Sequence, residues 1–522
     1  MRIYSAAAAA SLLLGTTARA QQVVWYHDGD NLGDSYGLIV TPVSDRDGDG
    51  VEDLFVGAPG TNCNGPVFGS APVLSGTAGA ELFRFCGTAT NELFGGDLCE
   101  IPDIDGDGIL DLVVGCPHHG DVDAGHEAGA AYIYSGGTQS LIYELIGESR
   151  SVQFGESCAS IADVDGDGVD DLLIGEPEYA ESGPPSRGRA FVYSAKTGTL
   201  LRRYEGANDY DRFGQIVARL GDIDADGMDD YAIQALATPA ASRGAVYVFS
   251  ALSGEQIFVW KGDHDFAGLG RSIANAGDLN DDGYDDVLLG APGGPPSGFL
   301  YGYSGKDGKV LFKLRGDRNR DFFGVACSMV GDMNGDGYQE ILVGADVDKH
   351  DGTNAGAAFL FSGKTRRVLY RFYPGYFQAV FGFQVVGGFD MNADGIPDVA
   401  ISAINAPPDS DGNYYGGRVT AFAGNDLFLQ SDLTDVSPGD TVNIASRGGP
   451  EGSLALLAVV DVSGSPVFVT LACTTLDANG ESTFTADVPD EAGGNTYTLM
   501  AYCQPLGTKV VIDSGAEMIV VQ

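Results

Sequence analysis

The chain has 522 residues, and 29 basic against 73 acidic side chains give it a formal net charge of −44. A surface this acidic repels nucleic acid and anionic membranes, which excludes both as partners. Hydrophobic residues make up 44% of the chain, too many for an intrinsically disordered acidic protein.

Residues 1–20 have the pattern of a secretory signal peptide. Arg2 precedes a short apolar run, and Ala18-Arg19-Ala20 supplies a cleavage site of small residues. The run is too short to span a bilayer, and no later segment is long and apolar enough to do so. We therefore predict a secreted, extracellular protein without a transmembrane segment, either free or associated with the cell surface.

Residues 21–425 contain a sevenfold repeat. An acidic loop recurs every 54 to 60 residues, and nine residues before each loop stands an aromatic residue or leucine followed by glycine, as in Tyr36-Gly37 and Phe94-Gly95. Each unit reads as four short strands with Gly, Pro and Asp at the turns, which is typical of a propeller blade. The fold class is thus all-β, with a seven-bladed β-propeller; a long solenoid is the structural alternative.

The N-terminal segment is expected to close the ring. The seventh unit stops after its third strand, "GRVTAFAG", whereas "QQVVWYHDG" near the N-terminus resembles the fourth-strand segment "QIFVWKGDH". The only two tryptophans, Trp25 and Trp260, occupy these two segments. A strand added from the N-terminus would complete the last blade and remove an exposed sheet edge.

The acidic loops are not EF-hands, because the twelfth position carries an aliphatic residue in all seven and no flanking helices are expected. Acidic or amide side chains stand instead at positions 1, 3, 5 and 9, and position 7 offers a backbone carbonyl. Clustered oxygens of this kind suit calcium better than magnesium, which gives up its water reluctantly. We predict up to seven structural Ca²⁺ ions. The expected ligands are Asp45, Asp47, Asp49, Val51 and Asp53; Asp103, Asp105, Asp107, Ile109 and Asp111; Asp163, Asp165, Asp167, Val169 and Asp171; Asp222, Asp224, Asp226, Met228 and Asp230; Asp278, Asn280, Asp282, Tyr284 and Asp286; Asp332, Asn334, Asp336, Tyr338 and Glu340; Asp390, Asn392, Asp394, Ile396 and Asp398.

Segments such as "DIDGDGILDLVVGCP" and "LGRSIANAGDLNDDGYDDVLLGAP" resemble the FG-GAP repeat family, which forms the propeller of integrin α subunits. The resemblance covers about residues 22–425. It implies a seven-bladed propeller with calcium on one face and an extracellular protein or glycan ligand on the opposite face. In units 4 and 7, Gln234-Ala235-Leu236 and Ser402-Ala403-Ile404 replace Gly-Ala-Pro, so their turns are expected to differ. The integrin legs and inserted ligand-binding domain are not recognised, and we expect a module other than an integrin subunit.

Two functions remain open at this stage. The first is a calcium-binding adhesion module without catalytic activity. The second is an extracellular polysaccharide hydrolase or lyase, which would need paired carboxylates away from the acidic loops. No catalytic motif is recognised, and no catalytic residue is predicted.

Three other groups of residues point less specifically to a binding site. The tripeptide Arg315-Gly316-Asp317 falls on the repeat's own turn. His118, His119 and His126 lie in one connection but lack the fixed spacing of a zinc site. Further connections to the same face carry candidate ligand contacts, namely Arg212, Arg318, Arg320, Tyr373 and Tyr376.

Eight cysteines in an exported chain suggest disulfides, whose connectivity a sequence does not determine. The pairs that we expect are Cys63 with Cys86, Cys99 with Cys116, and Cys473 with Cys503. Cys158 and Cys327 align with aliphatic residues of the other units and are expected to be buried and free.

Residues 426–522 lose the period and alternate apolar and polar residues between Gly and Pro turns. This pattern predicts a small Ig-like β-sandwich.

Overall fold

The structure is a computed structural model that describes residues 23–31, 33–63, 68–121, 126–148, 153–178, 186–236, 243–316, 318–350, 352–405 and 416–424. It also describes the backbone of seven short strands between residues 428 and 521. Every regular element in these ranges is a β-strand, and none of the described residues forms a helix that could cross a membrane. The predicted signal peptide lies outside the described residues.

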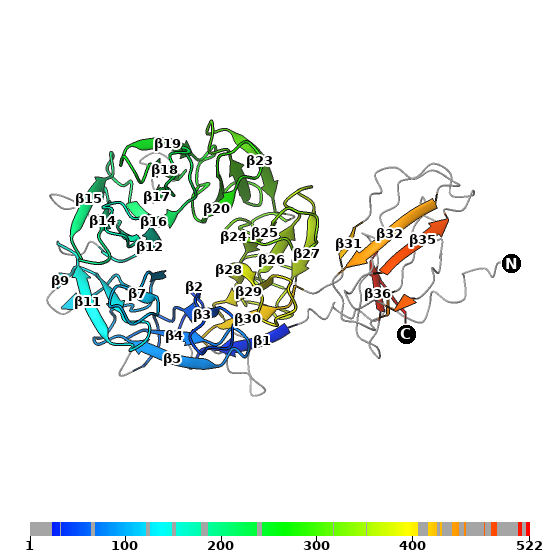
Figure 1. Cartoon of the computed structure of the whole chain (residues 1–522), viewed down its shortest axis with the longest axis horizontal. Helices are drawn as coiled ribbons and strands as arrows, with labels where there is room; N and C mark the ends of the chain where they lie inside the picture. Colours follow the sequence, from blue (N-terminus) through cyan, green and yellow to red (C-terminus); the bar gives the residue numbers. More distant parts are fainter. Residues whose placement is uncertain are drawn as a thin grey trace.

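Seven four-stranded antiparallel sheets surround a central axis, which confirms the predicted seven-bladed propeller (Figure 1). Each sheet is one blade, and its strands follow one another from the axis outward. The blades are β2 (Val40–Val43), β3 (Asp53–Val56), β4 (Ser70–Leu74) and β5 (Glu81–Cys86); β6 (Leu98–Ile101), β7 (Asp111–Cys116), β10 (Ala130–Tyr134) and β11 (Leu141–Ile146); β12 (Cys158–Ile161), β13 (Asp171–Glu176), β14 (Arg189–Tyr193) and β15 (Leu200–Glu205); β16 (Phe213–Arg219), β17 (Tyr231–Ala235), β18 (Ala245–Phe249) and β19 (Gln256–Lys261); β20 (Ile273–Gly277), β21 (Asp286–Ala291), β22 (Phe299–Tyr303) and β23 (Val310–Arg315); β24 (Cys327–Val330), β25 (Glu340–Ala345), β26 (Ala357–Phe361) and β27 (Val368–Phe372); β28 (Phe381–Phe389), β29 (Asp398–Ala403), β30 (Arg418–Phe422) and β1 (Val23–Asp28). The connection between β7 and β10 also forms a small hairpin of β8 (Gly120–Asp121) and β9 (His126–Glu127).

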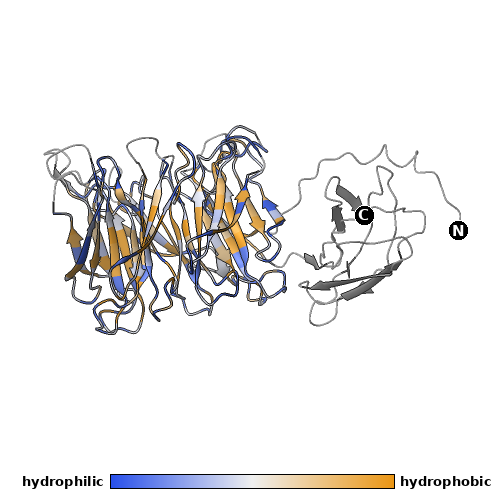
Figure 2. Ribbon diagram, turned by 90° about the horizontal axis from the view of Figure 1, so that it is seen from above, coloured by the Kyte–Doolittle hydropathy of each residue, from blue (hydrophilic) through white to orange (hydrophobic). Residues whose placement is uncertain are grey.

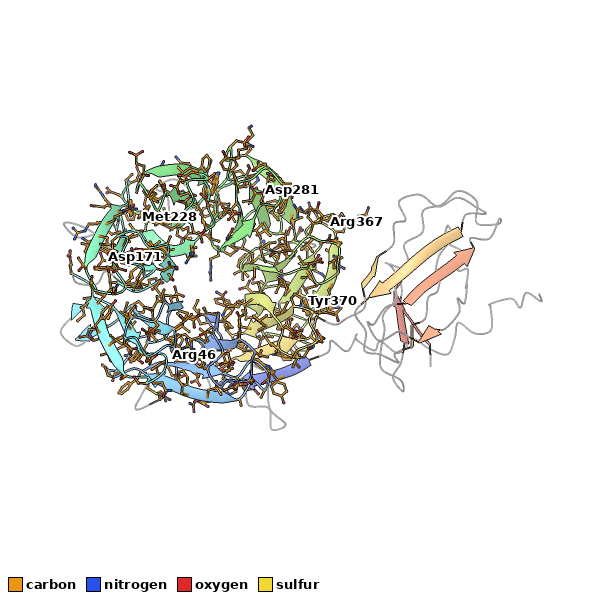
Figure 3. All side chains as sticks on the ribbon, viewed as in Figure 1. Arg46, Asp171, Met228, Asp281, Arg367 and Tyr370 are labelled. Carbon is orange, nitrogen blue, oxygen red and sulfur yellow. A yellow bond between two sulfur atoms is a disulfide. The ribbon has the colours of Figure 1, made fainter. Side chains whose placement is uncertain are left out.

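The hydrophobic core lies between neighbouring blades rather than in one central mass. The second strand of a blade is buried along its whole length, as in β21, because sheets cover both of its faces. The outer strand alternates between covered and exposed residues, as in β11, because only one of its faces meets a neighbour. Figure 2 shows this pattern, with hydrophobic strands and hydrophilic loops. Side chains fill the space between blades, whereas few reach the centre of the ring (Figure 3).

The repeated aromatic-glycine pair joins each blade to the preceding one. Phe94 is 1% exposed, and its backbone forms a parallel bridge with Gly69 of the preceding blade. A side chain at Gly57, at the end of a second strand, would place its Cβ 2.4 Å from the carbonyl oxygen of Gly95. Glycine is therefore required where the backbones of two blades come this close.

Units 4 and 7 differ at this contact, as expected. Gln234 takes the place of the glycine, and its Nε2 donates a hydrogen bond to the carbonyl oxygen of Leu269 at 3.2 Å. In blade 7 the Ser402 hydroxyl accepts a hydrogen bond from the Gln384 backbone N–H at 3.0 Å. The Gln234 bond crosses from blade 4 to blade 5, whereas the Ser402 bond stays within blade 7.

The N-terminal strand closes the ring, which confirms the prediction. β1 pairs with β30 as the outer strand of blade 7. Trp25 Nε1 donates to the Gly76 carbonyl oxygen at 2.6 Å, and Trp260 Nε1 makes the equivalent bond to Gly308 at 2.9 Å. The guanidinium of Arg418 forms two bonds to the Asp28 carboxylate, of 2.5 and 2.8 Å, across the closing pair of strands.

One predicted disulfide is confirmed and one is wrong. Cys63 and Cys86 are bonded, whereas Cys99 and Cys116 are both free and buried. Cys99 pairs with Val113 across the hairpin, so Cys116, three residues further on, faces the other side of the sheet. The two thiols therefore lie in different inter-blade cores.

Cys158 and Cys327 are free, as predicted, but only Cys158 is buried, whereas Cys327 is partly exposed. They pair with Ile174 and Val343 in the same register as the aliphatic residues of other blades. Cys473 and Cys503 lie outside the described residues.

Beyond the propeller, the described strands form three small antiparallel sheets. These are β31 (Phe428–Gln430), β32 (Thr441–Arg447) and β35 (Ser482–Asp487); β33 (Leu454–Ala455) and β34 (Thr474–Thr475); β36 (Val510–Asp513) and β37 (Met518–Val521). The rest of residues 426–522 lies outside the described residues, so the Ig-like sandwich stays a prediction.

Candidate metal centres and the opposite end of the propeller

The seven acidic loops lie at one end of the propeller. Each connects the innermost strand of a blade to the second strand, for example β2 to β3 and β20 to β21. Antiparallel neighbours place this connection at the same end in every blade. The repeat therefore arranges the predicted ligands as a circle of seven loops.

The carboxylate at position 1 holds each loop in shape. In the first loop, Asp45 accepts hydrogen bonds from the backbone N–H groups of Gly48 at 2.7 Å and Gly50 at 2.8 Å. The bond from position 6 to position 1 recurs in all seven loops at 2.7 to 2.9 Å. The hydrogen bond from Gly50, followed by that from Gly48, lowers the pKa of Asp45, which keeps this carboxyl ionised.

Positions 4 and 6 both adopt left-handed backbone conformations. Gly48 has φ of 80° and Gly50 has φ of 90°, with open space around both. Position 4 keeps a positive φ even where it is not glycine, at Ala225, Asp281 and Ala393. Sequence reasoning identified the glycine at position 6 and missed the same requirement at position 4, because only some of the copies carry glycine there.

The residue at position 9 is buried beneath each loop. Asp53 is fully buried and accepts hydrogen bonds from the backbone N–H groups of Arg46 at 2.7 Å and Gly76 at 2.9 Å. Burial, reinforced by the charges of Asp47 and Asp45, raises its pKa to about 6. Gly76 belongs to the turn between the third and fourth strands. Asp53 therefore links this turn, the acidic loop and the second strand of the blade.

The same position is perturbed in all seven loops. Burial raises the pKa of Asp111, of Asp230 to about 7 and of Glu340 to about 8, and neighbouring loop carboxylates add to each effect. Asp171, Asp286 and Asp398 are each raised to about 6 for the same reason. A cation bound in the loop would favour the ionised form of these carboxyls. It would therefore offset the free energy that burial costs their charged form.

Oxygen atoms from several positions converge in the loops. Among the described residues, three carboxylates have ligand atoms within 4.8 Å of one another in at least four of the loops. These groups are Asp45, Asp47 and Asp53; Asp103, Asp105 and Asp107; Asp163, Asp165 and Asp171; and Asp222, Asp224 and Asp230. In the sixth loop, Asn334 Nδ2 donates to Glu340 Oε1 at 2.7 Å. This donor set is all oxygen and strongly anionic, which fits a hard divalent cation.

The opposite end of the propeller carries exposed aromatic side chains. The connections from one blade's outer strand to the next blade's innermost strand place Tyr210, Phe266, Phe322 and Phe377 at 58, 71, 44 and 51% exposure. Exposed large aromatic groups at neighbouring positions are typical of binding surfaces. The sequence prediction for this face included Tyr373 and Tyr376 and missed all four of these residues.

Three of these aromatic residues adopt left-handed backbone conformations. Tyr210 has φ of 66°, Phe266 of 63° and Phe322 of 58°, a region that bulky residues rarely occupy. Tyr210 and Phe266 stand three residues before the aromatic-glycine position, where Asn91 has the same conformation in an earlier blade. Aligning the units at this position would have revealed them.

The other candidate ligand contacts are mostly engaged within the protein. Arg212 forms an ion pair with Glu178 at 2.7 Å, and Arg318 Nη2 lies 3.2 Å from His350 Nδ1. The ring of Tyr373 stacks on that of His350, with centroids 3.9 Å apart. Arg320 is exposed, and burial raises the pKa of Tyr376 to about 12. Asp317 of the Arg-Gly-Asp tripeptide lies outside the described residues.

The three histidines of blade 2 do not form one cluster in the described residues. His119 Nδ1 lies 3.0 Å from Glu92 Oε1 and 2.8 Å from the Tyr132 hydroxyl. His118 Nε2 instead lies 3.3 Å from Gln153 Nε2, and the side chain of His126 is outside the description.

Glu92, Cys116 and His119 do bring ligand atoms within 4.8 Å of one another. Cys116 Sγ, however, already donates to the Glu92 carbonyl oxygen at 3.3 Å, and Glu92 Oε2 accepts from the Ala89 N–H at 3.0 Å. These bonds satisfy the three groups without an ion. Glu92, which sequence reasoning missed, stands 27 residues before His119.

The comparisons with known proteins agree with this architecture. The family described as "FG-GAP-like repeat" matches residues 103–174, and the family described as "FG-GAP repeat" matches residues 269–311 and 328–361. The chain is 31% identical to integrin alpha-V of Gallus gallus over 211 residues, which are 37% of this chain and 19% of that protein.

Two further relatives match in the same way. Integrin alpha-5 of Xenopus laevis is 34% identical over 204 residues, or 36% of this chain and 19% of that protein. Integrin alpha pat-2 of Caenorhabditis elegans is 28% identical over 305 residues, or 58% of this chain and 17% of that protein. The matched part is thus less than a fifth of each relative. The chain carries FG-GAP repeats, and its propeller resembles that of integrin alpha subunits.

Proposed function

We propose that this protein is an extracellular, calcium-stabilised propeller that acts as an adhesion or ligand-binding module. The observation that carries the proposal is the sevenfold repetition of one acidic loop, with its position 1 carboxylate held by backbone N–H groups and its position 9 carboxyl buried. The resemblance to integrin alpha subunits supports a role in binding, and the predicted signal peptide supports export.

Calcium is the ion that these loops suit best. Each loop offers three or four side-chain oxygens, and a calcium site takes six to eight oxygens from carboxylates, carbonyls and water. The carbonyl at position 7, as at Val51, and water would complete the set. The buried carboxyl at position 9 then gains an opposite charge, which removes the cost that its raised pKa records.

The ligand would bind at the end of the propeller remote from the loops. Tyr210, Phe266, Phe322 and Phe377 provide exposed aromatic area there, and aromatic side chains are enriched in protein interfaces.

An enzymatic function has no comparable support. Asp97 lies in the central channel, but its two oxygens accept the backbone N–H groups of Leu98 at 3.0 Å and Cys158 at 2.7 Å. Its carboxylate is therefore engaged in holding two blades together.

The binding proposal is tested with arrays of immobilised glycans and extracellular matrix proteins, probed with the full chain in calcium. The informative variant is Tyr210→Asn with Phe266→Asn, because Asn91 shows that asparagine adopts the same backbone conformation. Leu252→Ser is the matched control, since Leu252 is 58% exposed in a turn at the loop end. We expect the double variant to lose binding and the control to keep it. Retained binding in the double variant, or no binding to either array, would contradict the proposal.

A further inference from the structure

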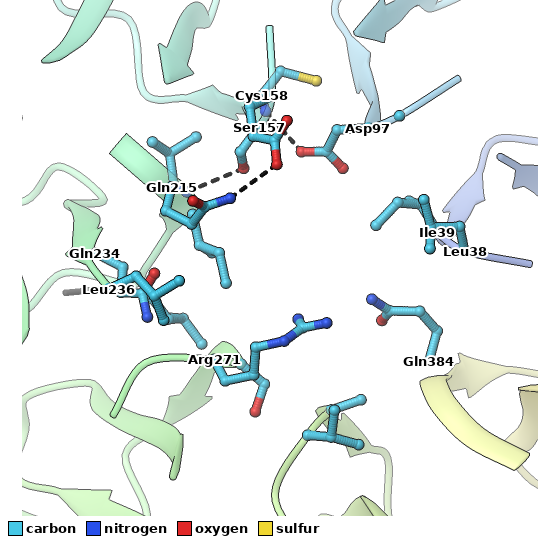
Figure 4. Close-up of a pocket in the computed structure, with 18 of the residues that line it drawn as sticks. Leu38, Ile39, Asp97, Ser157, Cys158, Gln215, Gln234, Leu236, Arg271 and Gln384 are labelled. Atoms are coloured by element: carbon cyan, nitrogen blue, oxygen red, sulfur yellow. Dashed lines mark hydrogen bonds between the residues drawn. The ribbon is translucent and has the colours of Figure 1, made fainter. Parts of the chain in front are cut away.

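The centre of the ring contains a cavity of about 570 Å³ (Figure 4). Its walls are the first residues of the innermost strands, so it lies toward the end remote from the acidic loops. One position of the repeat, directly after the aromatic-glycine pair, contributes to the wall in every blade. That residue is polar in three consecutive blades, as Glu156, Gln215 and Arg271, and apolar in three others, as Leu38, Val325 and Phe383.

Arg271 is the notable member of this ring. Its guanidinium points into the cavity (Figure 4), and no ion pair or side-chain hydrogen bond joins it to another of the described residues. Its one close contact is the face of the Phe383 ring, 5.5 Å from the guanidinium carbon to the ring centroid. Asp346 and Glu156 act on it only through longer-range attraction, while burial lowers its pKa. A partly buried arginine without an anionic partner is unfavourable, and an incoming anion would remove that cost.

The groups around Arg271 define what kind of anion fits. Gln384 points into the cavity from the opposite side (Figure 4) and offers amide N–H donors. Gln215 and Gln234 already donate through Nε2, to Glu156 at 2.8 Å and to the Leu269 carbonyl at 3.2 Å. The Oε1 atoms of both glutamines are buried away from the open space, so Gln384 supplies the amide that a ligand can reach, with N–H donors and one acceptor oxygen.

The cavity therefore combines three features. Arg271 suits a carboxylate, the amide oxygen of Gln384 suits a hydroxyl group, and Leu38, Val325 and Phe383 form an apolar wall. A volume of this size is within the range of small-molecule sites. The two carboxylates in the wall, Asp97 and Glu156, belong to blades 2 and 3 and already accept hydrogen bonds from the Cys158 N–H at 2.7 Å and from Gln215 at 2.8 Å, whereas Arg271 belongs to blade 5.

We propose that the central channel binds a small hydroxylated carboxylate, of which a uronic acid is the simplest form. This inference rests on the proposed ligand-binding function and specifies the chemistry of one site within it. A free uronic acid and a uronic acid unit of a glycan chain present the same groups to Arg271.

The test is isothermal titration of the full chain, in calcium, with glucuronate and with glucose, which differ only at the carboxylate. We expect glucuronate to bind at least about tenfold more tightly than glucose, because one hydrogen-bonded charge pair contributes about that factor. A glucuronate-containing disaccharide then distinguishes a free acid from a chain end.

Arg271→Gln should abolish the preference for glucuronate, and Arg271→Lys should retain part of it because the positive charge remains. Arg367→Gln is the matched control, since Arg367 is an exposed arginine in the turn before β27, outside the cavity wall. Melting curves would establish that each variant is folded. Equal binding of glucuronate and glucose, no binding of either, or an unchanged preference in Arg271→Gln would overturn the inference. Ligand binding on the arrays that depends on Tyr210 and Phe266 would leave the proposed function standing in each case.

Discussion

Removal of calcium should destabilise the propeller strongly at neutral pH. Without a cation, the buried carboxyl at position 9 must either take up a proton or carry an unpaired charge. Asp53 illustrates the size of the effect, because a pKa raised from 3.8 to about 6 corresponds to about 3 kcal/mol against ionisation in the folded state. Glu340, with a pKa of about 8, should still be largely protonated at pH 7.

Calcium would act through mass action on the folded state. One site filled at a free calcium concentration 100 times its Kd contributes about 2.7 kcal/mol, and seven equivalent sites contribute about 20 kcal/mol. In domains of 150–250 residues, about 1 kcal/mol shifts the melting temperature by 2–4 °C, and larger domains shift less. We therefore expect calcium to raise the melting temperature of the propeller by more than about 10 °C.

Differential scanning calorimetry in excess calcium and in excess chelator measures this shift. The shift should shrink at pH 5, where protons replace calcium on the buried carboxyls. Asp45→Asn should reduce it, whereas Asp307→Asn, in an exposed turn outside the acidic loops, should leave it unchanged. Superimposable melting curves at pH 7, with and without chelator, would refute the reasoning.

Three further predictions concern stability. In chelator, the urea midpoint should fall as pH rises from about 4 to 7. The raised pKa of Asp53 stabilises the folded state below pH 3.8, and this contribution is lost as pH passes about 6. A midpoint that rises over this range would contradict the prediction. Replacing both Cys63 and Cys86 by serine should cost about 3 kcal/mol of unfolding free energy, since their bond closes a loop over a separation of 23 residues; an unchanged urea midpoint contradicts this. Trp25→Ala should cost about 3–5 kcal/mol, whereas Tyr26→Ala, 57% exposed on the same strand, should cost far less; similar losses from both would show that the closing strand does not depend on Trp25.

The fixed spacing of the repeat made most of the propeller predictable. Once the acidic loops are aligned, the number of blades, the place of each loop and the role of the N-terminal strand follow, because residues at equal offsets occupy equal places. The predicted disulfide between Cys99 and Cys116 was wrong, because spacing along the chain does not decide which face of a sheet a side chain occupies. Cys99 and Cys116 flank one hairpin, but side chains alternate between the faces of a sheet, and the register puts the two thiols on opposite faces.

Features assembled from several blades were harder to foresee. The cavity chemistry depends on a single position read across the blades, and only the structure shows that this position faces the axis. Arg271 has no distinguishing context within its own unit. Likewise, the partner of His119 is Glu92, which lies in the preceding blade connection rather than in the histidine-rich loop. Spacings within one repeat unit do not reveal which residues of different blades come into contact.

The two proposed sites share the innermost strands, so they should influence one another. Arg271 stands two residues before β20, and Asp278 follows its last residue directly. Seven residues of extended chain separate the cavity from the fifth acidic loop by only about 23 Å. Calcium in that loop should hold the end of β20, and therefore the position of Arg271, more firmly.

We accordingly predict that Asp286→Asn, in the fifth loop, weakens glucuronate binding by about fivefold, the lower end of typical coupling between sites. Asp111→Asn, in the second loop, is the matched control, because that blade contributes only Gly96 and Asp97 to the cavity and Asp97 is already bonded to backbone N–H groups. By reciprocity, glucuronate should raise the calcium affinity of the fifth loop by the same factor. Titrations of both variants with glucuronate, at fixed calcium, measure the difference. Equal losses in the two variants would mean that calcium stabilises the ring as a whole and has no separate influence on Arg271.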